Sequence, residues 1–142
     1  MILVDVNVLV YAHRRDVPDH AAFRDWLTSV VNGEAAYGMS ELVLGGFIRI
    51  LTNPKAFNVP TVLDEAIAAA DRLRVQPNCV LVSPGPMHWD IFVRLCRAAG
   101  AKGNLVTDAY LAALAIESGA EWITTDRDFS RFPGLRWRHP LA

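Results

Sequence analysis

The chain has 142 residues, of which 52% are hydrophobic and 20% are charged, and its formal net charge is −1. This length suits a single domain, and so apolar a composition excludes a mainly disordered chain. Charged residues interrupt every apolar run before the ~20 residues that a bilayer-spanning helix needs, and Asp5 breaks the apolar start where a secretory signal would continue. We therefore expect residues 1–142 to form one cytoplasmic domain without a membrane anchor.

Short apolar stretches typical of strands alternate with helical stretches along the chain. In the first half, the expected elements are a strand at Ile2–Val6, a helix from about Asn7 to His13, a helix over Asp19–Val31, a strand at Ala35–Met39 and a helix from Glu41 to about Leu51. Ser40 can cap the last of these helices, and Pro54 ends it.

A second group of elements follows Pro60. Thr61 with Asp64 three residues later resembles a capping box, which would open a helix that continues to about Leu73. The elements expected after it are a strand at Cys79–Val82, a helix over Pro86–Ala99 stopped by Gly100, a helix over Asn104–Ser118 stopped by Gly119, a strand at Trp122–Thr125 and an edge strand at Leu135–Trp137.

Strands that alternate with helices, several of them continuous apolar runs, predict a parallel sheet covered on both faces. We therefore expect a three-layer α/β/α sandwich with a mainly parallel central sheet. In such sheets, ligands bind in the crevice beyond the carboxyl ends of the strands. The candidate functional residues are accordingly the polar ones at strand ends and helix starts.

Two carboxylates occur inside apolar stretches. Asp5 lies at the carboxyl end of the predicted first strand, and Asn7 points to the same side if the chain stays extended there. Asp108 is the only charged residue from Leu105 to Ile116, a stretch apolar enough for a buried helix. An ionised carboxylate at such a position is costly unless it is paired or bound to a metal, and helix capping alone does not explain the burial.

Three further acids lie at comparable places. Glu41 begins a predicted helix, Asp126 follows a predicted strand, and Asp128 lies two residues later. Taken singly, Glu41 and Asp128 are equally well explained by the helix macrodipole, which favours acids in a first turn. Together with the two buried acids, they predict a cluster of carboxylates at one rim of the sheet.

Such a cluster would raise the pKa values of its members unless a cation neutralised them. Oxygen ligands without cysteine or suitably spaced histidine select a hard cation, Mg²⁺ or Mn²⁺. The chemistry that needs this site is phosphoryl transfer, with a phosphodiester as the natural substrate. The basic residues nearest the rim, which could hold a phosphate backbone, are Arg14, Arg15, Arg49, Arg127 and Arg131.

Four segments of the chain carry a resemblance to a known family. They are Ile2-Leu3-Val4-Asp5-Val6-Asn7-Val8-Leu9, then Ser40-Glu41 heading a helix, then Asn104-Leu105-Val106-Thr107-Asp108-Ala109, then Ile123-Thr124-Thr125-Asp126-Arg127-Asp128-Phe129. This ordered set resembles the PIN-domain ribonucleases and, within them, the VapC toxins of bacterial toxin–antitoxin pairs. The resemblance spans the whole chain and implies a single PIN-like nuclease domain.

The resemblance implies an endoribonuclease that depends on Mg²⁺ or Mn²⁺, cleaves RNA and is neutralised by a cognate VapB-type antitoxin. It also implies a homodimer whose antitoxin covers the active-site groove. The matching acidic quartet is Asp5, Glu41, Asp108 and Asp126, with Asp5, Asp108 and Asp126 as the metal ligands. The auxiliary positions implied are Asn7 and Thr125, which would orient carboxylates or water, and Asp128, which is acidic in only some members.

Two other functions fit parts of the same pattern. The segment that starts at Asp5 is similar to the nucleophile segment of haloacid-dehalogenase-like phosphatases, although that family usually has Asp where this chain has Asn7. A catalytically idle binding module, whose acids receive a basic segment of a partner, is the other alternative. An aspartyl-phosphate on Asp5 would support the first, and tight partner binding without Mg²⁺ affinity would support the second.

Overall fold

The centre of the molecule is a sheet of five parallel strands. The computed structural model describes all 142 residues. The strands are β1 (Ile2–Val4), β2 (Tyr37–Met39), β3 (Cys79–Leu81), β4 (Glu121–Ile123) and β5 (Trp137–Arg138), and their order in the sheet is β3-β2-β1-β4-β5. Each neighbouring pair is parallel, which confirms the predicted sheet and brings all five carboxyl ends to one edge.

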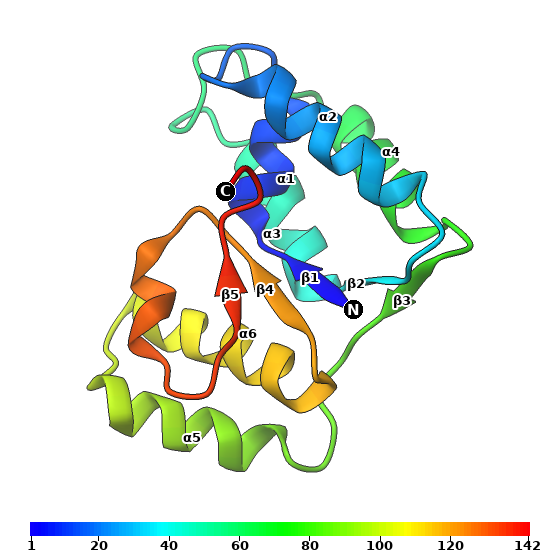
Figure 1. The fold of residues 1–142 in the computed structure, drawn as a ribbon. Coiled ribbons are helices and arrows are strands. Elements are labelled where there is room, and N and C mark those ends of the chain that lie inside the picture. The colour runs from blue at the N-terminus through cyan, green and yellow to red at the C-terminus, as the bar shows by residue number, and fades with distance from the viewer.

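Six α-helices cover the two faces of this sheet. They are α1 (Val6–His13), α2 (His20–Val31), α3 (Glu41–Leu51), α4 (Leu63–Arg74), α5 (His88–Ala99) and α6 (Asn104–Ser118). The chain moves outward in the sheet from β1 to β3 and then crosses back over to β4. Parallel crossovers are right-handed, so this reversal of direction moves the connecting helices to the other face. Helices α1 to α4 therefore lie on one face of the sheet, and α5 and α6 lie on the other (Figure 1). The expected three-layer sandwich is therefore confirmed.

The core is densest around the two central strands. Leu3, Val4, Trp122 and Ile123 are each at most 1% exposed. Helix α6 packs mainly small residues inward, and its fully buried alanines are Ala109, Ala112, Ala113 and Ala115. This close packing gives a rigid support for the strand ends. None of the helices combines the length and apolar character that a bilayer crossing requires.

The start of α1 differs from the prediction. The first strand ends at Val4, and α1 begins at Val6 with Asp5 as its N-cap residue. The chain is therefore helical, not extended, at Asn7. The physical reason is that a carboxylate oxygen of Asp5 accepts a hydrogen bond from the Val6 N–H, which has no partner inside the helix.

The predicted capping box at Thr61 is also wrong. Helix α4 begins at Leu63 and has no side-chain cap, because the N-cap residue is Val62, whose side chain cannot accept a hydrogen bond. Thr61 lies one residue before the cap position, and its hydroxyl accepts a hydrogen bond from Arg14. The predicted cap of α3 is confirmed, since Ser40 accepts from the Leu42 N–H at 3.2 Å. The remaining bounds differ from the predicted ones by no more than two residues.

Candidate functional site

The Asp5 carboxylate lies where β1 passes into α1, and the residue is only 7% exposed. Its Oδ1 accepts a hydrogen bond from the Val6 N–H, and its Oδ2 accepts one from the Thr124 hydroxyl, both at 2.7 Å. Thr124 follows β4, and its Oγ1 in turn accepts from the Asp126 N–H at 3.0 Å. These bonds tie the ends of two neighbouring strands together and fix the orientation of the carboxylate.

The acids at this edge perturb one another. The pKa of Asp5 rises from 3.8 to about 6, mainly because the carboxylate is buried. The hydrogen bond from Thr124 lowers this pKa in part, and the charge of Asp126 raises it further. The pKa of Asp108, half-buried on α6, also rises to about 6, first through burial and then through the charges of Asp126, Asp5 and Asp128. The fold thus brings together four of the predicted acids from separate parts of the chain.

Glu41 is the member of the predicted quartet that stands apart. It begins α3 at the carboxyl end of β2, on the same edge of the sheet. Its side chain is 72% exposed, however, and its Oε2 lies 3.2 Å from Nη2 of Arg74 at the end of α4. Its charge is not among the causes that shift the pKa of Asp5 or Asp108. The start of α3 is where we expected it, but the carboxylate faces an arginine.

The oxygen donors fit a divalent cation in an open site, not in a closed cage. No three carboxylate, histidine or cysteine side chains lie close enough to hold one ion between them. Mg²⁺ usually keeps several waters and takes one or two carboxylates directly, so it does not need such a cage. Asn7 offers a further oxygen, because its Oδ1 is buried without a hydrogen-bond partner. A cation would also offset the repulsion that raises the pKa values of Asp5 and Asp108.

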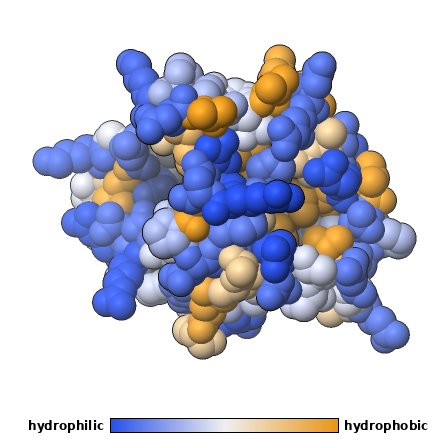
Figure 2. Space-filling view, turned by 90° about the horizontal axis from the view of Figure 1, so that it is seen from above, coloured by the Kyte–Doolittle hydropathy of each residue, from blue (hydrophilic) through white to orange (hydrophobic).

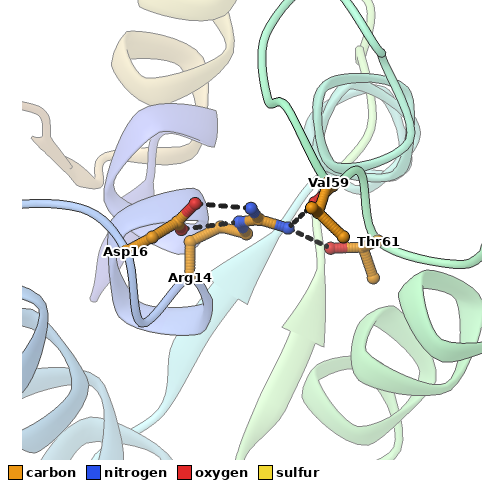
Figure 3. A network of polar contacts seen from close by, with 4 residues as sticks. All are labelled: Arg14, Asp16, Val59 and Thr61. Atoms are coloured by element: carbon orange, nitrogen blue, oxygen red, sulfur yellow. Dashed lines mark hydrogen bonds and ion pairs between the residues drawn. The ribbon is translucent and has the colours of Figure 1, made fainter.

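Arg14, one of the arginines considered for a phosphate backbone, is already engaged. Figure 3 shows its guanidinium between Asp16 on one side and Val59 and Thr61 on the other. It donates to both Asp16 oxygens at 2.9 and 2.6 Å, to the Val59 carbonyl at 2.8 Å and to Thr61 Oγ1 at 3.3 Å. The Phe57 ring centroid lies 4.0 Å from its Cζ. Arg14 therefore links the α1–α2 and α3–α4 connections, a role that sequence reasoning missed.

Two adjoining hollows lie away from the acids, between α1, α2 and α4. Their volumes are about 380 and 770 Å³, and Ala12, His13, Arg24 and Arg72 line both. Burial lowers the pKa of His13, so this ring favours the neutral form.

Figure 2, seen from above the view of Figure 1, shows a mainly hydrophilic face on which hydrophobic residues form separate patches.

Comparisons with known proteins agree with this architecture. Residues 2–135 match the family model described as PIN domain. Ribonuclease VapC43 of Mycobacterium tuberculosis is 46% identical over 141 residues, which are 99% of this chain and 96% of that protein.

Two solved structures show the same fold at low sequence identity. VapBC2 from Rickettsia felis, bound to a promoter DNA fragment, matches with a TM-score of 0.69 at 18% identity and covers 98% of both chains. VapC20 of Mycobacterium tuberculosis, described as a sarcin-ricin loop cleaving toxin, matches with a TM-score of 0.67 at 20% identity, over 96% of this chain and 99% of that one.

Proposed function

Because the chain belongs to the PIN-domain family and, within it, to the VapC ribonucleases, we propose that Asp5, Asp108 and Asp126 form the site for the divalent cation at which it hydrolyses RNA. One or two of these carboxylates would bind the ion directly, and the rest would act through waters of the ion, because no three of the side chains lie close enough to hold it together. As a member of this family, the protein is a metal-dependent ribonuclease and the toxin of a VapBC pair. We propose Mg²⁺ as the cation, with Mn²⁺ as a substitute, because all the donors are oxygens. An RNA substrate implies that the toxin acts in the cytoplasm.

One observation carries this proposal: the buried Asp5 carboxylate is held by Thr124 and lies in the field of Asp126, while Asp108 on α6 lies in the field of both acids. Ionised carboxylates gathered in this way destabilise one another unless a cation is bound. The gathering of three acids from separate elements is therefore a cost that a metal site explains and that helix capping does not.

Each side chain has a definable part in the proposed reaction. The bound cation would supply the positive charge that lowers the pKa of a water and stabilises the leaving oxygen of the phosphodiester. Thr124 and the Val6 N–H keep the Asp5 carboxylate oriented. We assign Asn7, Thr125 and Asp128 to the orientation of ligands or water around these acids.

Glu41 can join the site only if it leaves Arg74. Both side chains of this pair are substantially exposed, and an ion pair of that kind contributes at most about 1 kcal/mol. The attraction of the carboxylate to a bound divalent cation can offset so small a cost. We therefore retain Glu41 as a catalytic residue in the proposal and expect its side chain to turn toward the acids when the site is loaded.

RNA cleavage by the Asp5→Asn protein tests the proposal. We expect Mg²⁺-stimulated cleavage to fall at least about 100-fold, because the substitution removes a charge at the reacting centre, while the fold stays intact. Asp64→Asn, on the exposed first turn of α4, is the matched control and should cleave like the wild type. Cleavage by Asp5→Asn at the wild-type rate would overturn the assignment. A wild-type protein that binds its antitoxin but neither Mg²⁺ nor RNA would support an idle binding module.

As the toxin of a VapBC pair, the protein has a VapB-type antitoxin as its partner. We propose that the antitoxin docks in the two hollows between α1, α2 and α4 and that a further segment of it extends from there over the acids, where it would cover the active-site groove. Their lining includes apolar residues such as Leu9, Leu27 and Phe47, with Arg24 and Arg72 among the polar ones. An apolar floor with basic sides suits an amphipathic segment that carries acidic residues.

We also propose that two copies of the chain form a homodimer. Strand β3 lies at an edge of the sheet, and its Val80 and Leu81 are 43% and 45% exposed. A two-fold axis beside such an edge would pair the two β3 strands antiparallel through their free backbone groups, and side chains on either face of the joined sheet would pack against those of the partner. Light scattering should then report twice the 15.7 kDa of one chain, and the mass of a single chain would contradict the dimer.

A further inference from the structure

A third hollow, of about 590 Å³, lies beside the proposed metal site, and its lining includes Thr125, Arg127, Ser130, Arg138 and His139. We infer that this hollow binds a phosphate of the RNA backbone next to the cleaved bond. The inference rests on the proposed ribonuclease function and names where its substrate is held. Its volume is within the range of about 300–1,000 Å³ that is typical of ligand sites.

The topology places this hollow directly next to the acids. Strands β4 and β5 are parallel neighbours, and the Thr124 N–H donates to the Arg138 carbonyl at 3.1 Å. His139 therefore leaves the sheet beside Thr125, at the same edge. Thr125 in turn lies between Thr124, which holds Asp5, and Asp126. If an RNA strand lies across the acids, the phosphate next to the cleaved one would thus lie at the hollow.

The lining of the hollow is suited to an anion. Its polar side chains are two arginines, a histidine and two hydroxyls, and Trp137 and the last residue, Ala142, complete the lining. Arg127 forms no ion pair within the chain. Arg138 uses its Nε for Glu121 Oε1 at 2.9 Å, which leaves its terminal nitrogens to donate elsewhere. Guanidinium groups with neighbouring hydroxyls are typical donors to phosphate oxygens.

The proton on His139 is also placed for donation. The Leu141 N–H donates to His139 Nδ1 at 3.1 Å, so Nδ1 is the acceptor nitrogen. In the neutral ring the proton must then be on Nε2, which makes that nitrogen a donor. In this tautomer the ring therefore offers one hydrogen-bond donor in the lining of the hollow.

A nucleotide fits this hollow better than an acidic peptide does. Trp137, half-buried, is part of the lining, and an aromatic ring beside arginines provides a stacking surface for a base. Because the hollow is next to the proposed metal site, an RNA strand with its cleaved phosphodiester at the metal could also place a neighbouring nucleotide in the hollow. An acidic segment of the antitoxin is the competing occupant, and the experiment below separates the two.

The test measures binding of a labelled single-stranded RNA of about 20 nucleotides, in EDTA so that no cleavage occurs, over a series of salt concentrations. We expect Arg127→Gln to weaken RNA binding about tenfold. The plot of log affinity against log salt concentration should also become less steep by about 0.7, the value for one lost phosphate contact on a single strand. His139→Ala should weaken binding less, because it removes an uncharged donor. Arg97→Gln, exposed on α5 and outside the hollow, is the matched control for the loss of one positive charge and should stay within about twofold of the wild type.

Equal RNA affinity of the Arg127→Gln and wild-type proteins would overturn the inference, and so would a loss of antitoxin binding without a loss of RNA binding. The readout does not depend on catalysis, so the two proposals can fail separately. If Arg127→Gln cleaves and binds RNA like the wild type, the hollow has no such role and the nuclease stands. If RNA binding depends on Arg127 but the wild-type protein cleaves nothing, the hollow stands and the nuclease function fails.

Discussion

The Asp5 carboxylate is buried in the folded protein and solvated in the unfolded chain, so its proton affinity changes on folding. Its pKa rises from 3.8 to about 6, mainly through burial. Between these two values the folded state binds more protons than the unfolded state, and the free energy of unfolding therefore falls as the pH rises. The stabilising contribution is complete below about pH 4 and is lost as the pH rises through about 6.

The first prediction concerns this pH dependence in the metal-free protein. Urea unfolding at about pH 4.5 and about pH 7.5 should show that the wild type loses up to about 2 kcal/mol more than Asp5→Asn does over this interval, at 1.36 kcal/mol for each unit of pKa shift that the interval covers. Asp108 and His13, whose pKa values also shift, titrate in both proteins and largely cancel in the difference. Parallel pH profiles of the two proteins would show that Asp5 is not destabilised by its burial.

Glu41 provides a second test at the scale of single residues. Its pairing with Arg74 competes with its proposed part in the active site. Arg74→Gln should therefore leave the fold unchanged and raise cleavage at limiting Mg²⁺ by up to about fivefold, the equivalent of an exposed ion pair. Glu41→Gln should lower cleavage instead. An Arg74→Gln protein with reduced cleavage would indicate that the pair belongs to the working site.

At the scale of elements, local signals were reliable where a single residue decides the backbone. Gly100 and Gly119 end α5 and α6 with φ values of 58° and 70°, a conformation that favours glycine, so both helix ends were predicted correctly. Thr61 and Asp64 had the spacing of a capping box, but α4 begins one residue later than a cap at Thr61 requires, and the Thr61 hydroxyl contacts the distant Arg14. A spacing rule includes neither the exact start of a helix nor such tertiary partners.

The third prediction concerns Arg14, which joins two connections between helices. Its side chain is only 11% exposed, and removal leaves the Val59 carbonyl and Thr61 hydroxyl without their donor. Arg14→Gln should lower the free energy of unfolding by about 1–3 kcal/mol, the range for lost hydrogen bonds to a charged group. Asp16→Asn, at an exposed partner, is the control and should cost less. Equal stabilities of the wild-type and Arg14→Gln proteins in urea would contradict this role.

At the scale of the whole molecule, the parallel sheet and its two helical layers were predictable from alternating strands and helices. The prediction that Asp5, Asp108 and Asp126 lie near one another follows from the same principle, because the carboxyl ends of parallel strands share one edge, and the charges of these acids do act on one another. The pairing of Glu41 with Arg74 could not be predicted, because it depends on how the end of α4 packs beside the start of α3. The hollow at Thr125 was likewise beyond reach, since it needs the register of β5 against β4.

The fourth prediction concerns the antitoxin surface. Arg24→Glu together with Arg72→Glu should weaken antitoxin binding at least about tenfold, because like charges would then face an acidic partner segment. RNA cleavage by the free toxin should not change. Arg97→Glu, on α5 across the sheet, is the control for a general loss of positive charge. Unchanged antitoxin affinity of the double variant, measured by calorimetry, would place the partner elsewhere.

Calorimetric titration of the metal-free protein with Mn²⁺ tests the central claim most directly. If Asp5 and Asp108 hold one cation, Asp5→Asn and Asp108→Asn should each lower its affinity at least about tenfold, while Asp64→Asn should bind like the wild type. Wild-type affinity in both aspartate variants would contradict the account, because the gathered acids would then not be a metal site.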